Sequence, residues 1–168
     1  MKKTTLLLFL CLLLAGCAPR AYSDPFAYCA AVGQVDAPDA RYTGERLPDA
    51  LFLGYLKTAG LDPAADFPPS FKEMTSWRCM GGQVYACNVG ANIPCDSKAD
   101  TSQQPSQPMR DYCAQNPGAE FIPMFVTGHN IIYNWSCDKT EPRLGQAFDT
   151  VDAAGYQASF WQLVPATP

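Results

Sequence analysis

Apolar residues recur at helical spacing in two segments near the start of the chain. Asp24-Pro25 is typical of a helix N-cap followed by proline at the first helical position, and Gly33 is typical of a helix end, so a helix is predicted over 25–32. A second helix is predicted over 48–60, where apolar residues at i, i+1, i+4 and i+5 form one core-facing stripe. The proline-rich segment 61–73 then predicts a loop.

Period-two alternation of apolar and polar residues begins after this loop. Strands are predicted at 76–79 and 84–87, on either side of Gly81-Gly82, a dipeptide typical of two-residue hairpin turns. In that register Met80 faces Gln83, and Cys79 therefore faces Val84. The polar segment 96–107 predicts an exposed loop.

The last third of the chain is predicted to be rich in strands. A short helix over 108–115 precedes a fully apolar strand over 121–126, where Pro123 indicates an edge position or a bulge. Residues 127–130 predict a turn, and residues 131–137 alternate as a further strand. A loop near Pro142 and Gly145 then leads to a last strand over 156–164.

This order of elements predicts an α+β fold with a small antiparallel sheet of about five strands, two to three short helices and disulfide cross-links. No internal repeat or long linker interrupts residues 25–168, so we expect them to form a single domain. The length of 168 residues and the 48% of hydrophobic residues suit one packed core and exclude disorder over most of the chain.

The first residues carry the features of an export signal. Lys2 and Lys3 form a positive n-region, and the apolar run that follows is shorter than the ~20 residues that span a bilayer. Leu14-Ala15-Gly16-Cys17 resembles the lipobox of bacterial lipoproteins. The resemblance implies that 1–16 is a signal peptide, that Cys17 carries the acyl chains, and that 17–24 is a lipidated tether.

The lipoprotein resemblance also implies a location. We expect a bacterial envelope protein held in the membrane by two or three acyl chains on Cys17, because a single chain anchors only reversibly. Ala18 follows the lipidated cysteine where the inner-membrane retention residue of these proteins is aspartate, so the resemblance favours the outer membrane, facing the periplasm. The alternative is an ordinary secretory signal with an unrelated Cys17, and both place the protein outside the cytoplasm.

Loss of the leader changes the charge. The whole chain has a formal net charge of -4, and removal of Lys2 and Lys3 makes the side-chain charge -6. This acidic balance argues against nucleic-acid binding, which needs a basic footprint, and favours a basic partner through electrostatic steering.

Eight cysteines resolve into three groups. Cys11 leaves with the leader, and Cys17 carries lipid. Six remain, and in an oxidising compartment an even set predicts three disulfides: Cys29, Cys79, Cys87, Cys95, Cys113 and Cys137. Metal binding is the alternative, but no Cys-x-x-Cys pair is present, and a single histidine excludes zinc sites with two or more histidines. We expect no metal and no cofactor.

Geometry restricts the pairing of these cysteines without fixing it. Across a tight Gly81-Gly82 turn, Cys79 and Cys87 lie on opposite faces of the hairpin, so a bridge between them is not expected and each should pair with a more distant cysteine. Cys29 and Cys113 lie on predicted helices, which favours bridges from helix to sheet.

No catalytic set emerges from the remaining residues. His129, in a predicted turn, is the one histidine, and no Gly-x-Ser-x-Gly nucleophile elbow accompanies it. A glycan hydrolase would need two carboxyl groups, one of them with a raised pKa, and the spacing selects none of the scattered candidates. These are Asp36, Asp39, Glu45, Asp111, Glu120, Asp149 and Asp152.

Candidate binding residues come from charge clusters and aromatic positions. Alternating charges at Asp96, Lys98 and Asp100 suit a solvated loop better than a calcium loop, because the turn glycine is missing. Tryptophans 77, 135 and 161 lie on predicted strands, where they pack in a core or form an exposed platform for a glycan or peptide. The candidate binding residues are Arg78, Lys98, Asp100, His129 and Trp135.

Two classes of function follow from these features. The first is a lipid-anchored, non-catalytic binding or structural accessory module, with a basic protein or a glycan as partner; one concrete form is an inhibitor of a cationic secreted enzyme. Small lipid-anchored lysozyme inhibitors are similar in type, with a lipobox, cysteines and a sheet-rich body, although this chain shares none of their sequence motifs. The alternative is a small cell-wall or glycan hydrolase that uses a carboxylate pair.

Overall fold

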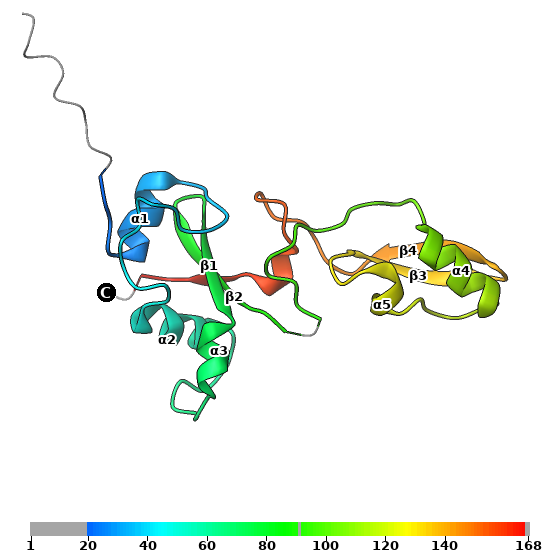
Figure 1. Ribbon diagram of the computed structural model, residues 1–168, viewed down its shortest axis with the longest axis horizontal. Coiled ribbons are helices and arrows are strands. Elements are labelled where there is room, and N and C mark those ends of the chain that lie inside the picture. Colours follow the sequence, from blue (N-terminus) through cyan, green and yellow to red (C-terminus); the bar gives the residue numbers. More distant parts are fainter. Residues whose placement is uncertain (1–19, 91, 167–168) are drawn as a thin grey trace, which may run out of the picture.

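The strands form two separate antiparallel sheets in the computed structural model, which describes residues 20–90 and 92–166 (Figure 1). The first sheet has the strand order β1-β2-β5, and the second is the β3–β4 hairpin. The strands are β1 (Thr75–Met80), β2 (Gln83–Asn88), β3 (Tyr133–Asp138), β4 (Glu141–Ala147) and β5 (Gln162–Val164). The α+β class is therefore confirmed, with the five strands of the described chain divided between two sheets.

Helices accompany each sheet. Figure 1 shows α1 (Pro25–Val32), α2 (Asp49–Thr58) and α3 (Pro69–Glu73) around the first sheet. The second sheet is accompanied by α4 (Gln107–Gln115) and α5 (Met124–Thr127). A single 3-10 turn, η1 (Ala158–Phe160), leads into β5. The described chain thus has more short helices than the two to three expected.

The local signals in α1 and in the first hairpin act as predicted. The Asp24 side chain accepts a hydrogen bond from the Ala27 N–H at 2.7 Å, which caps α1, and Gly33 ends the helix. Met80 pairs with Gln83 across the turn, whose two glycines have φ of 59° and 77°. Such left-handed values are typical of a type I′ hairpin and favour glycine.

Three expected elements differ from the structure. Segment 61–73 ends in α3, because Pro68 and Pro69 occupy the N-cap and first helical positions, where proline fits. The strand predicted over 121–126 is wrong, because Pro123 is the N-cap of α5. The loop predicted near Pro142 is also wrong: this segment is β4, an edge strand, where proline is tolerated.

The last predicted strand is shorter than expected. Only Gln162–Val164 pairs with β2, and the residues before it form η1 and a turn. At the other end of the described chain, the end of the expected tether is fixed to the fold. The Tyr22 N–H donates to the Arg41 carbonyl at 2.8 Å, and the Thr43 N–H donates to the Tyr22 carbonyl at 2.8 Å. The leader and Cys17 lie outside the described residues.

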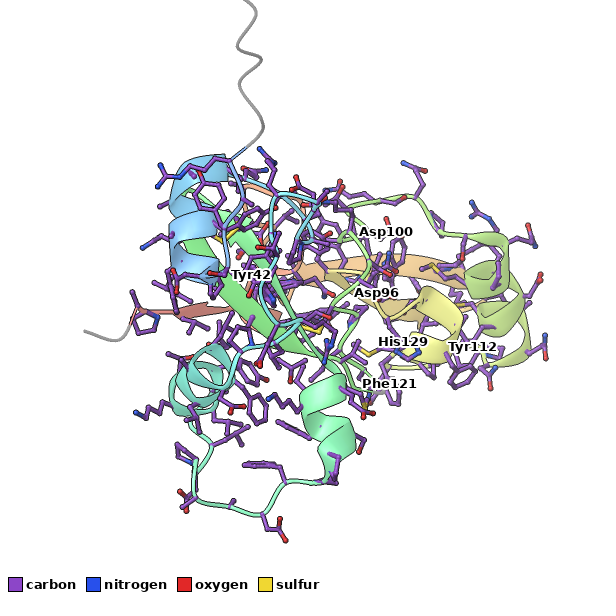
Figure 2. The ribbon with its side chains drawn as sticks, turned by 60° about the vertical axis from the view of Figure 1, so that its left-hand side comes forward. Tyr42, Asp96, Asp100, Tyr112, Phe121 and His129 are labelled. Carbon is purple, nitrogen blue, oxygen red and sulfur yellow. A yellow bond between two sulfur atoms is a disulfide. The ribbon has the colours of Figure 1, made fainter. Side chains whose placement is uncertain are left out.

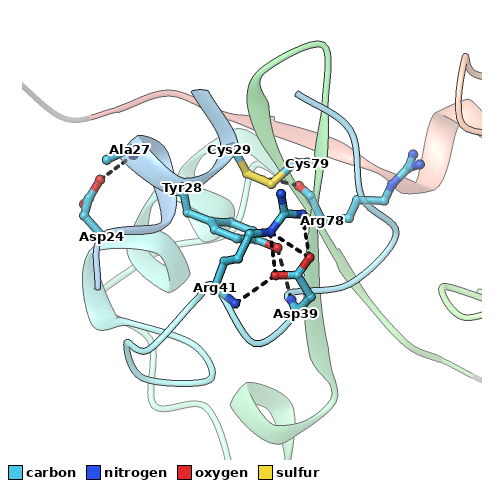
Figure 3. Close-up of a disulfide and its surroundings, with 8 residues drawn as sticks. All are labelled: Asp24, Ala27, Tyr28, Cys29, Asp39, Arg41, Arg78 and Cys79. Carbon is cyan, nitrogen blue, oxygen red and sulfur yellow. Dashed lines mark hydrogen bonds and ion pairs between the residues drawn. A yellow bond between two sulfur atoms is a disulfide. The ribbon is translucent and has the colours of Figure 1, made fainter. Parts of the chain in front are cut away.

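The three disulfides join Cys29 to Cys79, Cys87 to Cys95, and Cys113 to Cys137. The first and third run from helix to strand, as predicted, and Figure 3 shows the first beside the Tyr28 ring. Cys79 and Cys87 are not joined, which the hairpin geometry predicted. The expectation of a distant partner for Cys87 is wrong, because its partner lies only eight residues away. Gly90 and Ile93 exchange backbone hydrogen bonds, and this turn brings Cys95 back to β2.

Each sheet has its own buried cluster. In the first, Tyr28, Leu51, Trp77 and Val84 pack between the helices and the sheet. In the second, the largest buried side chains surround the Cys113–Cys137 bridge: Met109, Ile122, Ile131 and Trp135. A third cluster, with Tyr156 and Trp161, lies beside the Cys87–Cys95 bridge. All three tryptophans are buried, which confirms their packing role and leaves none as an exposed platform.

Candidate binding site

A pocket of about 580 Å³ opens beside the second sheet. We call it the aromatic pocket. Most of its walls come from the segment between α4 and the end of β3, with Asn92 and Phe148 contributing from elsewhere. Its lining residues are Asn92, Phe121, Ile122, Pro123, Met124, Phe125, Thr127, His129, Ile131, Tyr133, Asn134, Trp135 and Phe148. None of these described residues is an aspartate, glutamate, lysine or arginine.

The backbone before α5 positions one wall of the pocket. The Ile122 N–H donates to the Trp135 carbonyl at 2.7 Å, and the Cys137 N–H donates to the Ala119 carbonyl at 2.8 Å. Segment 119–122 is therefore bonded along β3, on the edge that β4 leaves free. Pro123 then turns the chain into the single turn of α5.

Three phenylalanine side chains of the pocket face solvent. Phe121 is 69% exposed, Phe125 is 79% exposed and Phe148 is 44% exposed. Scattered single apolar residues are ordinary on protein surfaces, whereas here three exposed aromatic rings line one pocket. Exposed aromatic side chains gathered at one place are typical of a binding surface.

Trp135 and His129 are the predicted site residues that the structure brings to this pocket. Trp135 is buried, and its indole Nε1 has no hydrogen-bond partner among the described residues. His129 is exposed. It directly follows Gly128, the C-cap of α5, which has a φ of 97°. Figure 2 shows His129 and Phe121 close to each other beside α5.

Arg78 lies in a different environment from the one expected of a binding residue. Its side chain is fully buried and forms an ion pair with the carboxylate of Asp152. The guanidinium carbon lies 4.3 Å from the centroid of the Tyr156 ring and 4.2 Å from that of Trp161, which is cation–π geometry. Figure 3 shows the Arg78 side chain pointing away from the Asp39–Arg41 pair. This arginine therefore fixes the C-terminal segment to β1.

Lys98 meets the same aromatic ring as Arg78. Its ammonium lies 3.9 Å from the Tyr156 centroid, pairs with the Asp36 carboxylate at 2.6 Å and donates to the Ala154 carbonyl at 2.6 Å. The side chains of Lys98 and Asp36 are each about half exposed. Lys98 thus ties the loop after Cys95 to both the N-terminal and the C-terminal segments.

Backbone hydrogen bonds of Asp100 join the loop after Cys95 to the residues just before β3. Its N–H donates to the Asn130 carbonyl at 2.6 Å, and its carbonyl accepts from the Ile132 N–H at 3.2 Å. Its carboxylate accepts from the Ser102 N–H at 2.8 Å, so the side chain stabilises a local turn. Nearby, the Gln157 amide donates to the Ile131 carbonyl at 3.1 Å. Asp100 and Gln157 therefore hold residues 130–132, the segment that leads into β3.

Two carboxyl groups of the described chain have clearly shifted pKa values, and both are lowered. Hydrogen bonds from Arg41 hold the pKa of Asp39 well below its usual range. Burial raises the pKa of Asp152, but the hydrogen bonds from Arg78 and from the backbone N–H groups of Tyr156 and Ala154 outweigh it, so the pKa is lowered. Both groups are stabilised as carboxylates, the opposite of what a general acid in glycan hydrolysis requires.

The described residues contain no cluster of three or more His, Cys, Asp or Glu side chains able to hold a metal ion. Within the same residues, no helix has the length and apolar character to cross a bilayer. The chain matches no protein-family model, no curated protein and no solved structure.

The exposed phenylalanines were missed as binding residues by the sequence reasoning. Phe121 and Phe125 belong to an apolar run that predicts a buried strand, and Phe148 follows a segment read as loop. The available signal is Pro123, because a proline inside an apolar run argues against a central strand and for a turn that leaves its neighbours exposed.

Proposed function

We propose that this chain is a non-catalytic binding protein, anchored in the bacterial envelope by acyl chains on Cys17, that holds its partner in the aromatic pocket. The observation that carries the proposal is the set of three exposed phenylalanine rings around one pocket. Aromatic side chains are enriched where proteins bind partners, because each buries a large area at a low cost in side-chain entropy.

A carboxylate-pair hydrolase has less support. The described lining of the aromatic pocket holds no carboxylate, and the two carboxyl groups with shifted pKa values are committed to Arg41 and Arg78. His129 lines the pocket, but Thr127 is the one aliphatic hydroxyl among the described residues beside it. The arrangement suits recognition better than covalent chemistry.

Anchoring is tested by metabolic labelling with a palmitate analogue, followed by separation of inner and outer membranes. We expect label on the wild-type chain in the outer-membrane fraction and none on Cys17→Ala, because the acylated thiol is then missing. Equal labelling of Cys17→Ala, or a wild-type chain recovered wholly in the soluble periplasmic fraction, would overturn the anchored part of the proposal.

Binding through the pocket is tested by affinity capture from detergent-solubilised envelopes. The double variant Phe121→Ser/Phe125→Ser removes the two most exposed rings, and Leu53→Ser is the matched control, because Leu53 is 42% exposed on α2 and does not line the pocket. We expect one partner that is retained by the wild type and by Leu53→Ser and is lost from the double variant. Identical capture by all three proteins would remove the pocket as the binding surface.

A further inference from the structure

We infer that the aromatic pocket docks an apolar side chain presented by a cationic protein. The inference rests on the proposed function and names the partner for the same site. It follows from two properties: a pocket whose described lining holds no carboxylate, lysine or arginine, and an excess of carboxylates in the part of the chain that forms most of the pocket.

The pocket itself suits an apolar anchor. Its described lining carries no aspartate, glutamate, lysine or arginine, so insertion of a charged side chain would leave that charge unpaired. Rings at Phe121, Phe125 and Phe148 surround it, and a volume of about 580 Å³ accommodates one large side chain with its neighbours. Binding energy at protein interfaces concentrates in such central aromatic contacts.

The part of the chain that forms the pocket is acidic. Between residues 100 and 150, carboxylates outnumber cations six to three. The carboxylates are Asp100, Asp111, Glu120, Asp138, Glu141 and Asp149, and the cations are Arg110, Lys139 and Arg143. Glu120 is exposed and directly precedes Phe121, and Asp149 directly follows Phe148. Glu120 therefore places an exposed negative charge next to Phe121 in the chain, whereas the Asp149 carboxylate accepts hydrogen bonds from the Thr150 N–H and the Ser159 hydroxyl.

A cationic protein with an exposed apolar side chain is attracted by the carboxylates and also fits the pocket. Other occupants gain from only one of these two properties. Electrostatic attraction accelerates the encounter with the cationic protein, and the apolar side chain then slows its release. A neutral glycan gains nothing from the carboxylates. A second copy of this chain carries the same excess of negative charge, so repulsion opposes self-docking.

The test is a binding titration of the purified, lipidated protein in detergent against a panel of cationic envelope-attacking enzymes, including lysozymes of different types. Each titration is run at about 0.01 M and about 0.15 M salt, where the Debye length falls from about 30 Å to about 8 Å. We expect at least one complex, with an association rate that falls steeply at the higher salt.

Two pairs of variants separate the anchor from the charge. Phe125→Ser is expected to weaken the complex about tenfold or more at both salt concentrations, mainly through faster dissociation, while Leu53→Ser leaves it unchanged. Glu120→Gln is expected to lower the association rate at low salt more than Glu73→Gln does, because Glu73, an exposed carboxylate on α3, does not neighbour a pocket residue in the chain.

Each alternative gives a distinct result. The cationic-protein assignment is overturned by no binding to any panel member at low salt, or by complexes that Phe125→Ser does not weaken. It is also overturned if a neutral peptidoglycan fragment binds the pocket without salt dependence, or if the chain forms a dimer that Phe125→Ser disrupts. If the panel fails while pocket-dependent capture from envelopes persists, the proposed function stands and only this partner is wrong.

Discussion

The guanidinium of Arg78 and the carboxylate of Asp152 form a buried ion pair that joins β1 to the segment before β5. Asp152 also accepts hydrogen bonds from the N–H groups of Ala154 and Tyr156, and the rings of Tyr156 and Trp161 lie against the guanidinium. The pair is thus the centre of the contacts that fold the C-terminal segment back onto the first sheet.

Removal of one partner of this pair is expected to destabilise the fold strongly. Asp152→Asn leaves the Arg78 charge buried without a counter-charge, which typically costs about 3–5 kcal/mol in the free energy of unfolding. Asp36→Asn is the control, because the Lys98–Asp36 pair is half exposed and should be worth less than about 1 kcal/mol. Urea unfolding measures both, and equal small losses would contradict the central role of Arg78.

The same pair predicts a pH dependence. The pKa of Asp152 is lowered in the folded state, so its contribution is complete above the unfolded pKa of about 3.9 and is lost as pH falls through the folded value. The difference in unfolding free energy between the wild type and Asp152→Asn should therefore narrow below about pH 4. The pKa of Asp39 is also lowered, but Asp39 is present in both proteins, so its contribution cancels in the difference and only that of Asp152 remains. A constant difference between neutral pH and about pH 2 would contradict this assignment.

The three disulfides are expected to differ in their contribution to stability. Their sequence separations are 50, 24 and 8 residues, for Cys29–Cys79, Cys113–Cys137 and Cys87–Cys95. Loop-closure entropy assigns them about 4, about 3.5 and about 2.5 kcal/mol. Paired cysteine-to-alanine variants, unfolded in urea, should lose stability in that order. The reverse order would show that strain or residual unfolded structure, and not loop length, decides the contribution.

We expect that β4 tolerates no side chain larger than hydrogen at Gly145 without loss of stability. A Cβ atom at this position would lie 2.9 Å from the Asn134 carbonyl oxygen on β3, closer than real contacts allow. Gly145→Ala should therefore shift the hairpin and cost about 1–3 kcal/mol in unfolding free energy, as overpacking does elsewhere. Gly90→Ala is the control, because its Cβ would make only ordinary contacts with Ile93, at 3.6 Å or more. Thermal unfolding that ranks the two variants equally would contradict the prediction.

Features encoded by neighbouring residues were predictable from the sequence. The cap of α1 by Asp24 and the register set by Gly81-Gly82 depend on residues only a few positions apart. Asp24 satisfies an N–H that the helix leaves free, and the two glycines reach backbone angles that other residues avoid. Local chemistry decides both features, so the pattern is sufficient.

Features that depend on distant residues were not predictable. Arg78 and Asp152 are 74 residues apart, and nothing in their surroundings in the sequence indicates that they meet. The candidate site was predicted only in part: His129 and Trp135 were singled out, but the exposed rings were not. A run such as Phe121-Ile-Pro-Met-Phe125 favours burial by composition. In the structure, hydrogen bonds to β3 hold segment 119–122 and Pro123 turns the chain into α5, and the rings of Phe121 and Phe125 are both exposed.

Site-specific photo-crosslinking in living cells tests the aromatic pocket as the binding surface most directly. A photoreactive phenylalanine analogue is placed at Phe125 in the pocket and, as the control, at Leu53 on α2. The predicted result is a discrete crosslinked partner from position 125 and none from position 53. No adduct from position 125, or the same adducts from both positions, would contradict the account.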